Sequence, residues 1–122
     1  MEIKDKLTQL IIGCCYEVHN HLGPVFLEKI YANALAIKLQ QAGLSFQVEK
    51  QFDVIFENVV VGKFRCDLFI ENKVIVELKS IVGYQPKLFQ SQLISYLKAS
   101  RIKTGLLINF GNSSCEIKRL SV

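Results

Sequence analysis

The second half of the chain contains acidic and basic residues whose spacing suits a site for a divalent cation and a phosphate. Asp67 is followed by Glu77, and Lys79 comes two positions after Glu77. Two carboxylates supply the oxygen ligands that Mg²⁺ prefers, and a neighbouring ammonium stabilises negative charge that develops on a phosphate. Because such a D-x₉-E-x-K spacing also arises by chance, its meaning depends on the elements that carry these residues.

The elements that carry Asp67 and Glu77 are predicted to be two antiparallel strands. Residues 59–70 and 74–80 are rich in β-branched and aromatic residues, and Glu71-Asn72-Lys73 separates them as a turn. If the hairpin closes through this turn, its register is fixed and one of its faces is apolar throughout, which assigns that face to the core. The pairs on the apolar face are Ile70 with Val74, Leu68 with Val76, and Cys66 with Leu78.

The other face of this hairpin would place like charges opposite each other, Asp67 against Glu77 and Arg65 against Lys79. Directly opposed side chains have Cβ atoms about 5 Å apart, and like charges at that distance are destabilising. A Mg²⁺ ion held between Asp67 and Glu77 would resolve the first conflict. Two alternatives stay open: the hairpin slips by one residue, or Asp67 pairs with Lys79 and Glu77 with Arg65 as ordinary surface charges.

Two polar residues lie near the apolar stripe of a helix predicted over 86–100. Gln92 and Tyr96, one turn apart, are expected on the inward side of this helix, where a buried glutamine needs hydrogen-bond partners. They are therefore candidates for the site. The alternative is a core tyrosine beside a half-exposed glutamine. The stripe itself consists of Phe89, Leu93 and Leu97, with Leu88 at its edge.

Glu28 is a further candidate for the site. It borders the apolar stripe of a helix that Pro24 is expected to open and that runs to about Ala42, with Gly43 terminating it. Glu28 could tilt from this helix toward the sheet. The alternative is structural, because a carboxylate in the first turn of a helix is stabilised by the helix dipole.

The remaining elements follow from hydrophobic periodicity. Apolar residues at three- and four-residue steps predict a first helix over 3–22, and continuous or alternating apolar runs predict strands over 46–56, 104–110 and 115–120. The resulting order ααβββαββ indicates an α/β sandwich, a mixed central sheet flanked by helices. Ile12 and Tyr16 fall on the otherwise polar side of the first helix, a patch that a second copy of the chain could cover in a homodimer.

Length and composition limit the class of protein. The 122 residues predict one domain, 1–122, and 50% hydrophobic against 21% charged residues can form its core. The four cysteines lack zinc-site spacing and are expected to be buried free thiols. Neither a signal peptide nor a membrane span is apparent, so we expect a cytoplasmic protein without a membrane partner.

The net charge of +4 is unevenly distributed along the chain. Residues 1–61 hold five Lys and Arg against seven Asp and Glu, a balance of −2, whereas residues 62–122 hold ten against four, a balance of +6. The second half is therefore where a polyanion such as nucleic acid would bind. A solvated basic face is an equally good explanation of the charge alone.

Five stretches of the chain, together with Asp67, form a recognisable set. They are Asn20-His21-Leu22-Gly23-Pro24, Leu27-Glu28-x-x-Tyr31, Ile75-Val76-Glu77-Leu78-Lys79, Gln92-Leu93-Ile94-Ser95-Tyr96-Leu97 and Ile108-Asn109-Phe110-Gly111. This set resembles the core of the PD-(D/E)XK nuclease superfamily and, more closely, the small bacterial GxxExxY proteins. The resemblance extends from the first helix to Arg119. The chain departs from the family pattern at Val25, where the first glycine of GxxExxY would fall, and at Cys66, where the proline of "PD" would fall.

The resemblance implies a restriction-endonuclease-like fold and metal-dependent hydrolysis of nucleic acid, for which DNA is favoured over RNA and RNA stays open. It implies that Asp67, Glu77 and the backbone carbonyl of Leu78 bind Mg²⁺, for which Mn²⁺ can substitute, and that Lys79 assists the attack of water. Glu28 would add a ligand or position a water.

The resemblance further implies that Gln92 and Tyr96 hold the substrate backbone or brace the metal ligands. Val25 is expected to alter the turn before Glu28. The alternative function is a non-catalytic module that keeps the nuclease fold and binds nucleic acid or protein.

Overall fold

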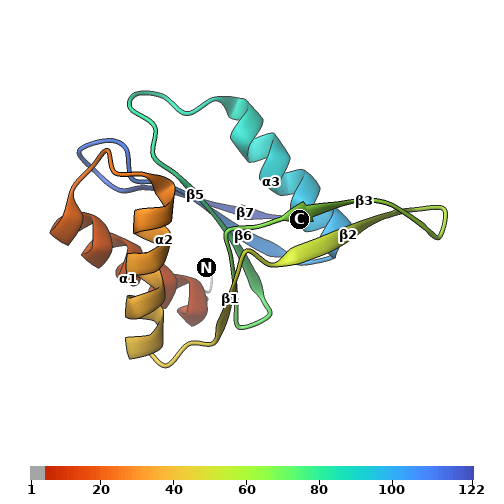
Figure 1. Ribbon diagram of the computed structural model, residues 1–122, viewed down its shortest axis with the longest axis horizontal. Coiled ribbons are helices and arrows are strands. Elements are labelled where there is room, and N and C mark those ends of the chain that lie inside the picture. The colour runs from red at the N-terminus through yellow and green to blue at the C-terminus, as the bar shows by residue number, and fades with distance from the viewer. Residues whose placement is uncertain (1–4) are drawn as a thin grey trace, which may run out of the picture.

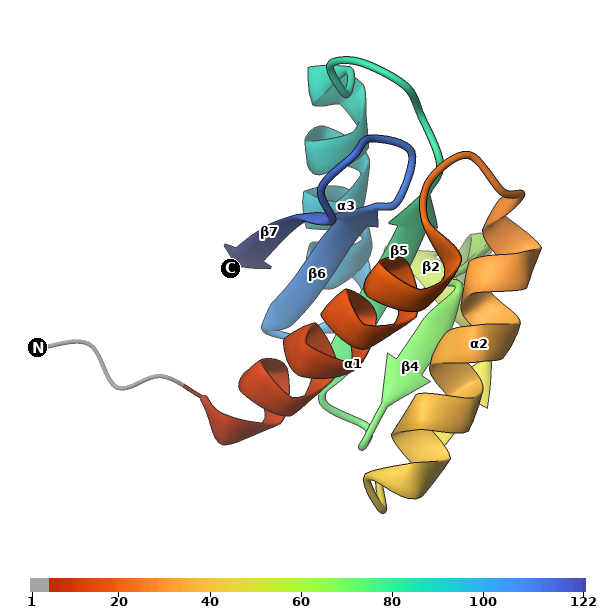
Figure 2. The same ribbon diagram turned by 90° about the vertical axis from the view of Figure 1, so that its left-hand side faces the viewer.

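The computed structural model describes residues 5–122 as three helices and seven strands. A mixed sheet carries helices on both faces, which confirms the predicted α/β sandwich (Figures 1 and 2). The elements are α1 (Lys6–Leu22), α2 (Glu28–Gln41), β1 (Phe46–Val48), β2 (Gln51–Phe56), β3 (Val59–Arg65), β4 (Leu68–Ile70), β5 (Val74–Lys79), α3 (Lys87–Ser100), β6 (Thr104–Asn109) and β7 (Glu116–Ser121).

The strands form two sheets. A five-stranded sheet has the order β1-β4-β5-β6-β7, and only its central pair, β5 with β6, is parallel. Strands β2 and β3 form a separate two-stranded sheet, a hairpin that projects from the body of the molecule (Figure 1). Residues Val74 to Leu78 of β5 are all buried. Such a strand, buried on both faces, is typical of the middle of a sheet that helices cover on both sides.

Each face of the five-stranded sheet has its own apolar cluster. Helices α1 and α2 cover one face, where Leu68, Val76 and Leu78 of the sheet belong to the same buried cluster as Tyr31 and Leu35. Helix α3 covers the other face (Figure 2). The cluster on the α3 side consists of Cys66, Phe69, Ile75, Leu93, Leu97 and Leu107.

The predicted order of elements needs one correction, because two predicted strands are each broken in two. The strand predicted over 46–56 breaks at Glu49 and Lys50, and the strand predicted over 59–70 breaks at Cys66 and Asp67. Two backbone hydrogen bonds join the breaks, from Glu49 N to Asp67 O at 2.9 Å and from Cys66 N to Lys50 O at 3.0 Å. The chain therefore leaves the main sheet and returns to it at a single point.

The predicted hairpin register is correct on one side of this break. Leu68 pairs with Val76 and Ile70 with Val74, as expected from the turn at 71–73. Beyond the break the register does not continue, because Arg65 pairs with Gln51 of β2 and therefore does not lie opposite Lys79. For the same reason Cys66 packs on the α3 side and not beside Leu78 on the opposite side.

The helix ends also differ in part from the predictions. The predicted start of the first helix at Ile3 lies outside the described residues, and within them α1 is capped by Asp5, whose carboxylate accepts the Leu7 N–H at 2.9 Å. Helix α2 begins at Glu28 and not at Pro24, because Val25 has a left-handed backbone with φ +75°. At its other end, Gly43 follows α2 with φ +75°, as expected of a glycine that terminates a helix.

Burial and covalent state agree with several expectations. All four cysteines are buried free thiols. Ile12 of α1 is partly buried against the core, so of the predicted exposed pair only Tyr16 is exposed, at 46%. Within residues 5–122, no helix combines the length and apolar character that crossing a membrane requires.

Candidate active site

Asp67 and Glu77 lie together where the sheet divides. Asp67 occupies the break between β3 and β4, and its backbone N–H donates to Glu77 Oε2 at 2.9 Å. The carboxylate of Asp67 in turn accepts the Leu78 N–H at 2.7 Å. The predicted proximity of the two acids is therefore present. The cause of this proximity differs from the predicted one. The strand break brings the two acids together, and they are not cross-strand neighbours in the ladder.

Burial dominates the electrostatics of these two carboxyl groups. Glu77 is only 7% exposed, and burial, with the Asp67 charge adding to it, raises the pKa of Glu77 to about 7. Burial also raises the pKa of Asp67, against the opposing effects of the Leu78 N–H and the Lys79 charge. The structure thus places two acids where negative charge is costly unless a cation or a proton balances it.

Lys79 supplies positive charge without an ion pair to either acid. Its Nζ lies 4.2 Å from the ring centroid of Phe89, a cation–π contact from β5 to α3. The Lys79 charge nevertheless opposes the rise that burial causes in the pKa of Asp67, Glu77 and Glu28. The diagonal pairs considered as an alternative, Asp67 with Lys79 and Glu77 with Arg65, do not form among residues 5–122.

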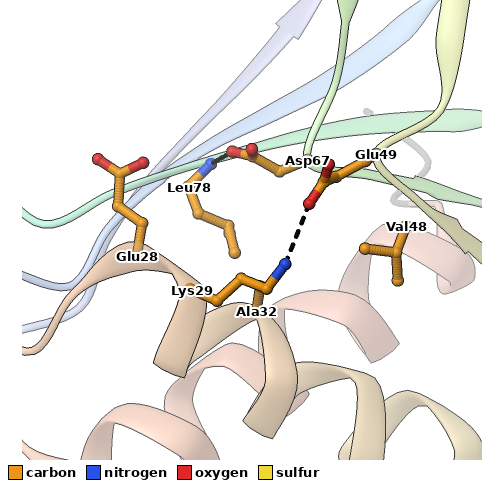
Figure 3. A pocket seen from close by; sticks show the side chains of 7 residues that line it. All are labelled: Glu28, Lys29, Ala32, Val48, Glu49, Asp67 and Leu78. Carbon is orange, nitrogen blue, oxygen red and sulfur yellow. Dashed lines mark hydrogen bonds and ion pairs between the residues drawn. The ribbon is translucent and has the colours of Figure 1, made fainter.

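Glu28 faces the same region from the start of α2. Partial burial raises the pKa of its carboxyl group, the Lys79 charge lowers it and the Asp67 charge raises it again. Together with Asp67 and Leu78, Glu28 lines a cavity of about 220 Å³ between α2 and the sheet (Figure 3). The structure therefore brings all three predicted acids, with Lys79, to one end of β5.

The loop before Glu28 is held in place by hydrogen bonds to Tyr31 and Ser80. The hydroxyl of Tyr31, a fully buried residue stacked on Phe110, donates to Gly23 O at 2.6 Å and accepts the Phe26 N–H at 3.1 Å. Ser80 Oγ donates to Phe26 O at 2.5 Å, which fastens this loop to the residue after Lys79. The same loop contains Val25, whose positive φ is strained for a β-branched side chain and free of strain for glycine.

Glu49 is a residue of this region that the sequence did not reveal. It lines the cavity beside Asp67, and its carboxylate binds Lys29 Nζ at 3.1 Å (Figure 3). The same carboxylate binds Arg65 Nη1, also at 3.1 Å. The hydrogen bond from Lys29 and the two positive charges lower the pKa of Glu49. Neither glycine nor proline marks the break at Glu49, where φ is +54°, so the apolar alternation of 46–56 concealed it.

The predicted positions of Gln92 and Tyr96 are only partly correct. Tyr96 is half-buried and stacks on Phe64 with ring centroids 4.1 Å apart, and burial followed by the Glu77 and Asp67 charges raises the pKa of its phenol. Gln92 is exposed and does not point into the core as expected. Because it is three residues after Phe89 and four before Tyr96, it shares their side of α3.

A second polar cluster, also missed from the sequence, supports the loop after Lys79. Asn109 is fully buried and pairs with both backbone groups of Ile81, accepting its N–H and donating to its carbonyl, each at 2.9 Å. Asn112 forms the same two bonds with Gly83, at 2.8 and 2.9 Å. A Cβ atom at Gly111 would lie 2.3 Å from Ile81 N, so only glycine allows this approach.

The acids of the site fit a divalent cation by their donor chemistry. Asp67 and Glu77 each commit one oxygen to a backbone N–H, and the other oxygen of each accepts no hydrogen bond within residues 5–122. A buried and a half-buried carboxyl group with raised pKa values and uncommitted oxygens suit a hard cation. In this part of the chain no three His, Cys, Asp or Glu side chains gather as a metal cluster, so the backbone and water would have to complete the coordination.

Comparisons with known proteins agree with this fold. A family model described as the PD-(D/E)XK nuclease superfamily matches residues 5–120. Among solved structures, the chain is similar to one described as "Crystal structure of SSO0001", with a TM-score of 0.57 and 16% sequence identity, covering 97% of this chain and 78% of that chain. This likeness shows a shared fold. A search of curated proteins found no match.

Proposed function

Because the chain belongs to the PD-(D/E)XK nuclease superfamily, we propose that it hydrolyses phosphodiester bonds of nucleic acid, DNA in preference to RNA, with Mg²⁺ as its cofactor. The observation that carries this proposal is the contact between the buried Glu77 and the half-buried Asp67, both with raised pKa values, beside Lys79. A site that only stabilised the fold would not collect uncompensated acids in this way.

Each residue of the site has a distinct proposed role. Asp67, Glu77 and the Leu78 carbonyl hold Mg²⁺, for which Mn²⁺ can substitute. When bound, a divalent cation supplies Lewis acidity and makes a bound water more acidic. Lys79, steadied by the Phe89 ring, orients the attacking water and stabilises charge on the phosphate.

Residues on the two helices would contact the substrate or its attacking water. Glu28 accepts a proton from water or holds a second water, and partial burial raises the pKa of its carboxyl group. Tyr96 braces the ligands from the α3 side, and the exposed Gln92 contacts the nucleic acid backbone beside it. Lys29 and Arg65, which both bind the carboxylate of Glu49, provide positive charge on the Glu49 side of the site.

We further propose that the chain is a GxxExxY protein of bacterial origin that acts in the cytoplasm. The motif Leu27-Glu28-x-x-Tyr31 supports the branch, because Tyr31 fixes the loop that introduces Glu28. The four free thiols support a reducing compartment. The whole chain acts as one nuclease domain in this proposal, and a homodimer would extend its small surface for gripping a duplex.

The decisive experiment measures cleavage of a panel of single-stranded, duplex and branched DNA and RNA with Mg²⁺ or Mn²⁺. We expect Glu77→Ala and Lys79→Ala to lose about 100-fold or more in rate while circular dichroism shows an intact fold. Lys98→Ala, in the last turn of α3, is the matched control and should cleave normally. Cleavage retained by both site variants would identify a contaminating nuclease and reject the proposal.

Cation binding has a readout that does not depend on cleavage. At pH 8, Mg²⁺ should raise the Tm of the protein, because a ligand that binds only the folded chain stabilises it. Glu77→Gln should diminish that rise, and Glu116→Gln should leave it unchanged. Salt-dependent binding of nucleic acid without cleavage by any divalent ion would instead favour the non-catalytic module.

A further inference from the structure

A second cavity, larger than the one beside Asp67, lies next to the loop that joins β5 to α3. Its volume is about 540 Å³, within the range of pockets that hold small ligands. Tyr84 and Gln85 of the loop, Gln90 of α3 and Lys118 of β7 are among its lining residues. None of these residues takes part in the site at Asp67 and Glu77.

Tyr84 stands at the rim of this cavity without support from the protein. It is 101% exposed, so its whole ring is open to solvent, and Val82 on the same loop is 70% exposed. An aromatic ring exposed to this degree is available for stacking against a flat partner. Nucleobases are such partners, and stacking on aromatic side chains is sequence-tolerant because every base has a π-face.

The loop that carries Tyr84 is held rigidly although its side chains are exposed. Asn109 and Asn112 each bind both backbone groups of one loop residue, Ile81 and Gly83 respectively. A loop fixed on both sides of Val82 presents Tyr84 in a defined direction, so little conformational entropy is lost when a ligand stacks on it. The loop therefore has the features of a preorganised binding element.

The polar groups of the cavity suit the edge and the phosphate of a nucleotide. The side chains of Gln85 and Gln90 can each donate and accept hydrogen bonds, as base edges require. Gln85 Oε1 is buried and has no hydrogen-bond donor within residues 5–122, a cost that a ligand could remove by drawing the side chain into the cavity. Lys87 and Lys118 add positive charge for a backbone phosphate and outnumber the one carboxylate of the lining, Glu116, which accepts hydrogen bonds from Asn109 and Asn112.

The cavity also lies within reach of the proposed catalytic residues. Tyr84 follows Lys79 by five residues, which span at most about 18 Å when extended. A nucleic acid strand has one phosphate about every 3.4 Å along its axis, so about five nucleotides cover that distance. One strand can therefore pass from Lys79 to the cavity.

We infer that this cavity binds an unpaired nucleobase of the substrate, with Tyr84 stacked on the base and Lys87 or Lys118 on an adjacent phosphate. The inference rests on the proposed nuclease function and deepens it. It defines the substrate class as nucleic acid with an unpaired base within about five nucleotides of the scissile bond. A fully paired duplex has no base free to enter the cavity.

The test uses the absence of tryptophan from the chain. Tyr84→Trp introduces a single indole at the cavity, and Tyr16→Trp, on an exposed position of α1, is the matched control. Each variant is titrated in EDTA, which prevents cleavage, with a single-stranded DNA 15-mer and with the corresponding blunt duplex. We expect the single strand to quench the emission of Tyr84→Trp only, and the duplex to quench neither variant.

Affinity measurements separate stacking from charge attraction. Tyr84→Ala should weaken binding of the single strand by about tenfold, with the dependence of Kd on salt unchanged, because stacking releases no counterions. Lys87→Ala should instead reduce the salt slope by about one. Equal weakening of single strand and duplex by Tyr84→Ala, or no quenching of Tyr84→Trp, would overturn the inference.

The same data distinguish failure of this inference from failure of the proposed function. If the protein cleaves nucleic acid with Mg²⁺ but Tyr84→Trp is not quenched, the nuclease stands and the base-binding cavity is rejected. If Tyr84→Trp is quenched by the single strand but the unmodified protein cleaves nothing, the cavity stands as a binding site and the nuclease is rejected.

Discussion

Two polar clusters lie near the ends of the parallel strands β5 and β6, and they satisfy their buried groups in different ways. Asn109 is neutral, fully buried and bonded to Ile81, Gly111 and Glu116. Asp67 and Glu77 are acids, each with one oxygen bonded to a backbone N–H, and burial raises the pKa of both. The Asn109 cluster finds its hydrogen-bond partners within the fold, whereas the Asp67–Glu77 pair needs a cation or a proton to balance its charge.

The difference indicates how the chain separates stability from function. A carboxamide carries a donor and an acceptor, so Asn109 can continue the hydrogen-bond pattern of the sheet beyond the end of β5. A carboxylate pair has only acceptors and accumulates negative charge, which costs folding free energy. The neutral Asn109 cluster therefore fixes the loop beside the site. The Asp67–Glu77 pair lowers the stability of the fold but provides carboxylates for a cation.

The largest expected change in stability follows from removing Asn109, the centre of the neutral cluster. Asn109→Ala leaves both backbone groups of Ile81 and the N–H of Gly111 without their partner, and each buried unpaired group costs about 1 to 3 kcal/mol. We expect the free energy of unfolding to fall by about 4 kcal/mol in urea denaturation. Asn33→Ala, on the exposed side of α2, should change it by less than about 0.5 kcal/mol. A loss at Asn109 no greater than that of the control would contradict the comparison.

A substitution in the Asp67–Glu77 pair should change the free energy of unfolding in the opposite direction and increase it. The folded pKa of Glu77, about 7, lies above its ordinary value of 4.5, so stability decreases as pH rises through this window. Glu77→Gln removes that decrease and should raise the free energy of unfolding at pH 8 by on the order of 2 to 3 kcal/mol. At pH 4 the variant and the parent should be nearly equal.

The control for this pH profile is Glu17→Gln, which removes a carboxylate that is exposed and paired with Lys38. Its profile should follow that of the parent across the same window. Denaturation curves at several pH values measure the free energy of unfolding of both variants and the parent. A Glu77→Gln variant less stable than the parent at pH 8 would mean that the carboxylate stabilises the fold.

A smaller effect is expected at Tyr31, whose hydroxyl supports the third acid of the site. Tyr31→Phe keeps the stacked ring but removes the bonds to Gly23 and Phe26, which should cost about 1 to 2 kcal/mol. If that loop positions Glu28, cleavage should fall more than stability alone explains. Tyr16→Phe, at an exposed site, controls for the loss of a hydroxyl. Thermal unfolding and initial rates of cleavage measure the two effects, and unchanged rates would remove the positioning role.

The smallest effect, again an increase in stability, is expected when Val25 is replaced by glycine. A left-handed backbone costs a residue with a side chain about 1 to 2 kcal/mol, and glycine avoids this cost while gaining freedom in the unfolded chain. Val25→Gly should therefore stabilise the protein by about 0.5 to 1 kcal/mol. Val82→Gly, at an exposed loop position without positive φ, should destabilise it slightly. Equal losses in both variants would show that Val25 is not strained.

Local patterns predicted those parts of the fold that local physics determines. The turn at 71–73 and the apolar alternation around it fixed the register of β4 with β5. The proximity of Asp67 and Glu77 was predicted from that register, but the break between β3 and β4 produces it. The break at Glu49 was not predictable, because it depends on backbone bonds to a segment far along the chain. Gln92 was placed incorrectly for a similar reason, since only the packing of α3 decides which side of that helix is covered.

The paired breaks at Glu49–Lys50 and Cys66–Asp67 make the β2–β3 hairpin a modular extension. Two backbone hydrogen bonds close its base, so the path of the main sheet is complete without the hairpin tip. At that tip Phe56 and Val59 flank the Glu57-Asn58 turn and are more than 60% exposed. Insertions or deletions there would change how far the protein extends over its substrate and leave the position of Asp67 untouched. Related chains can therefore vary in reach while their chemistry stays constant.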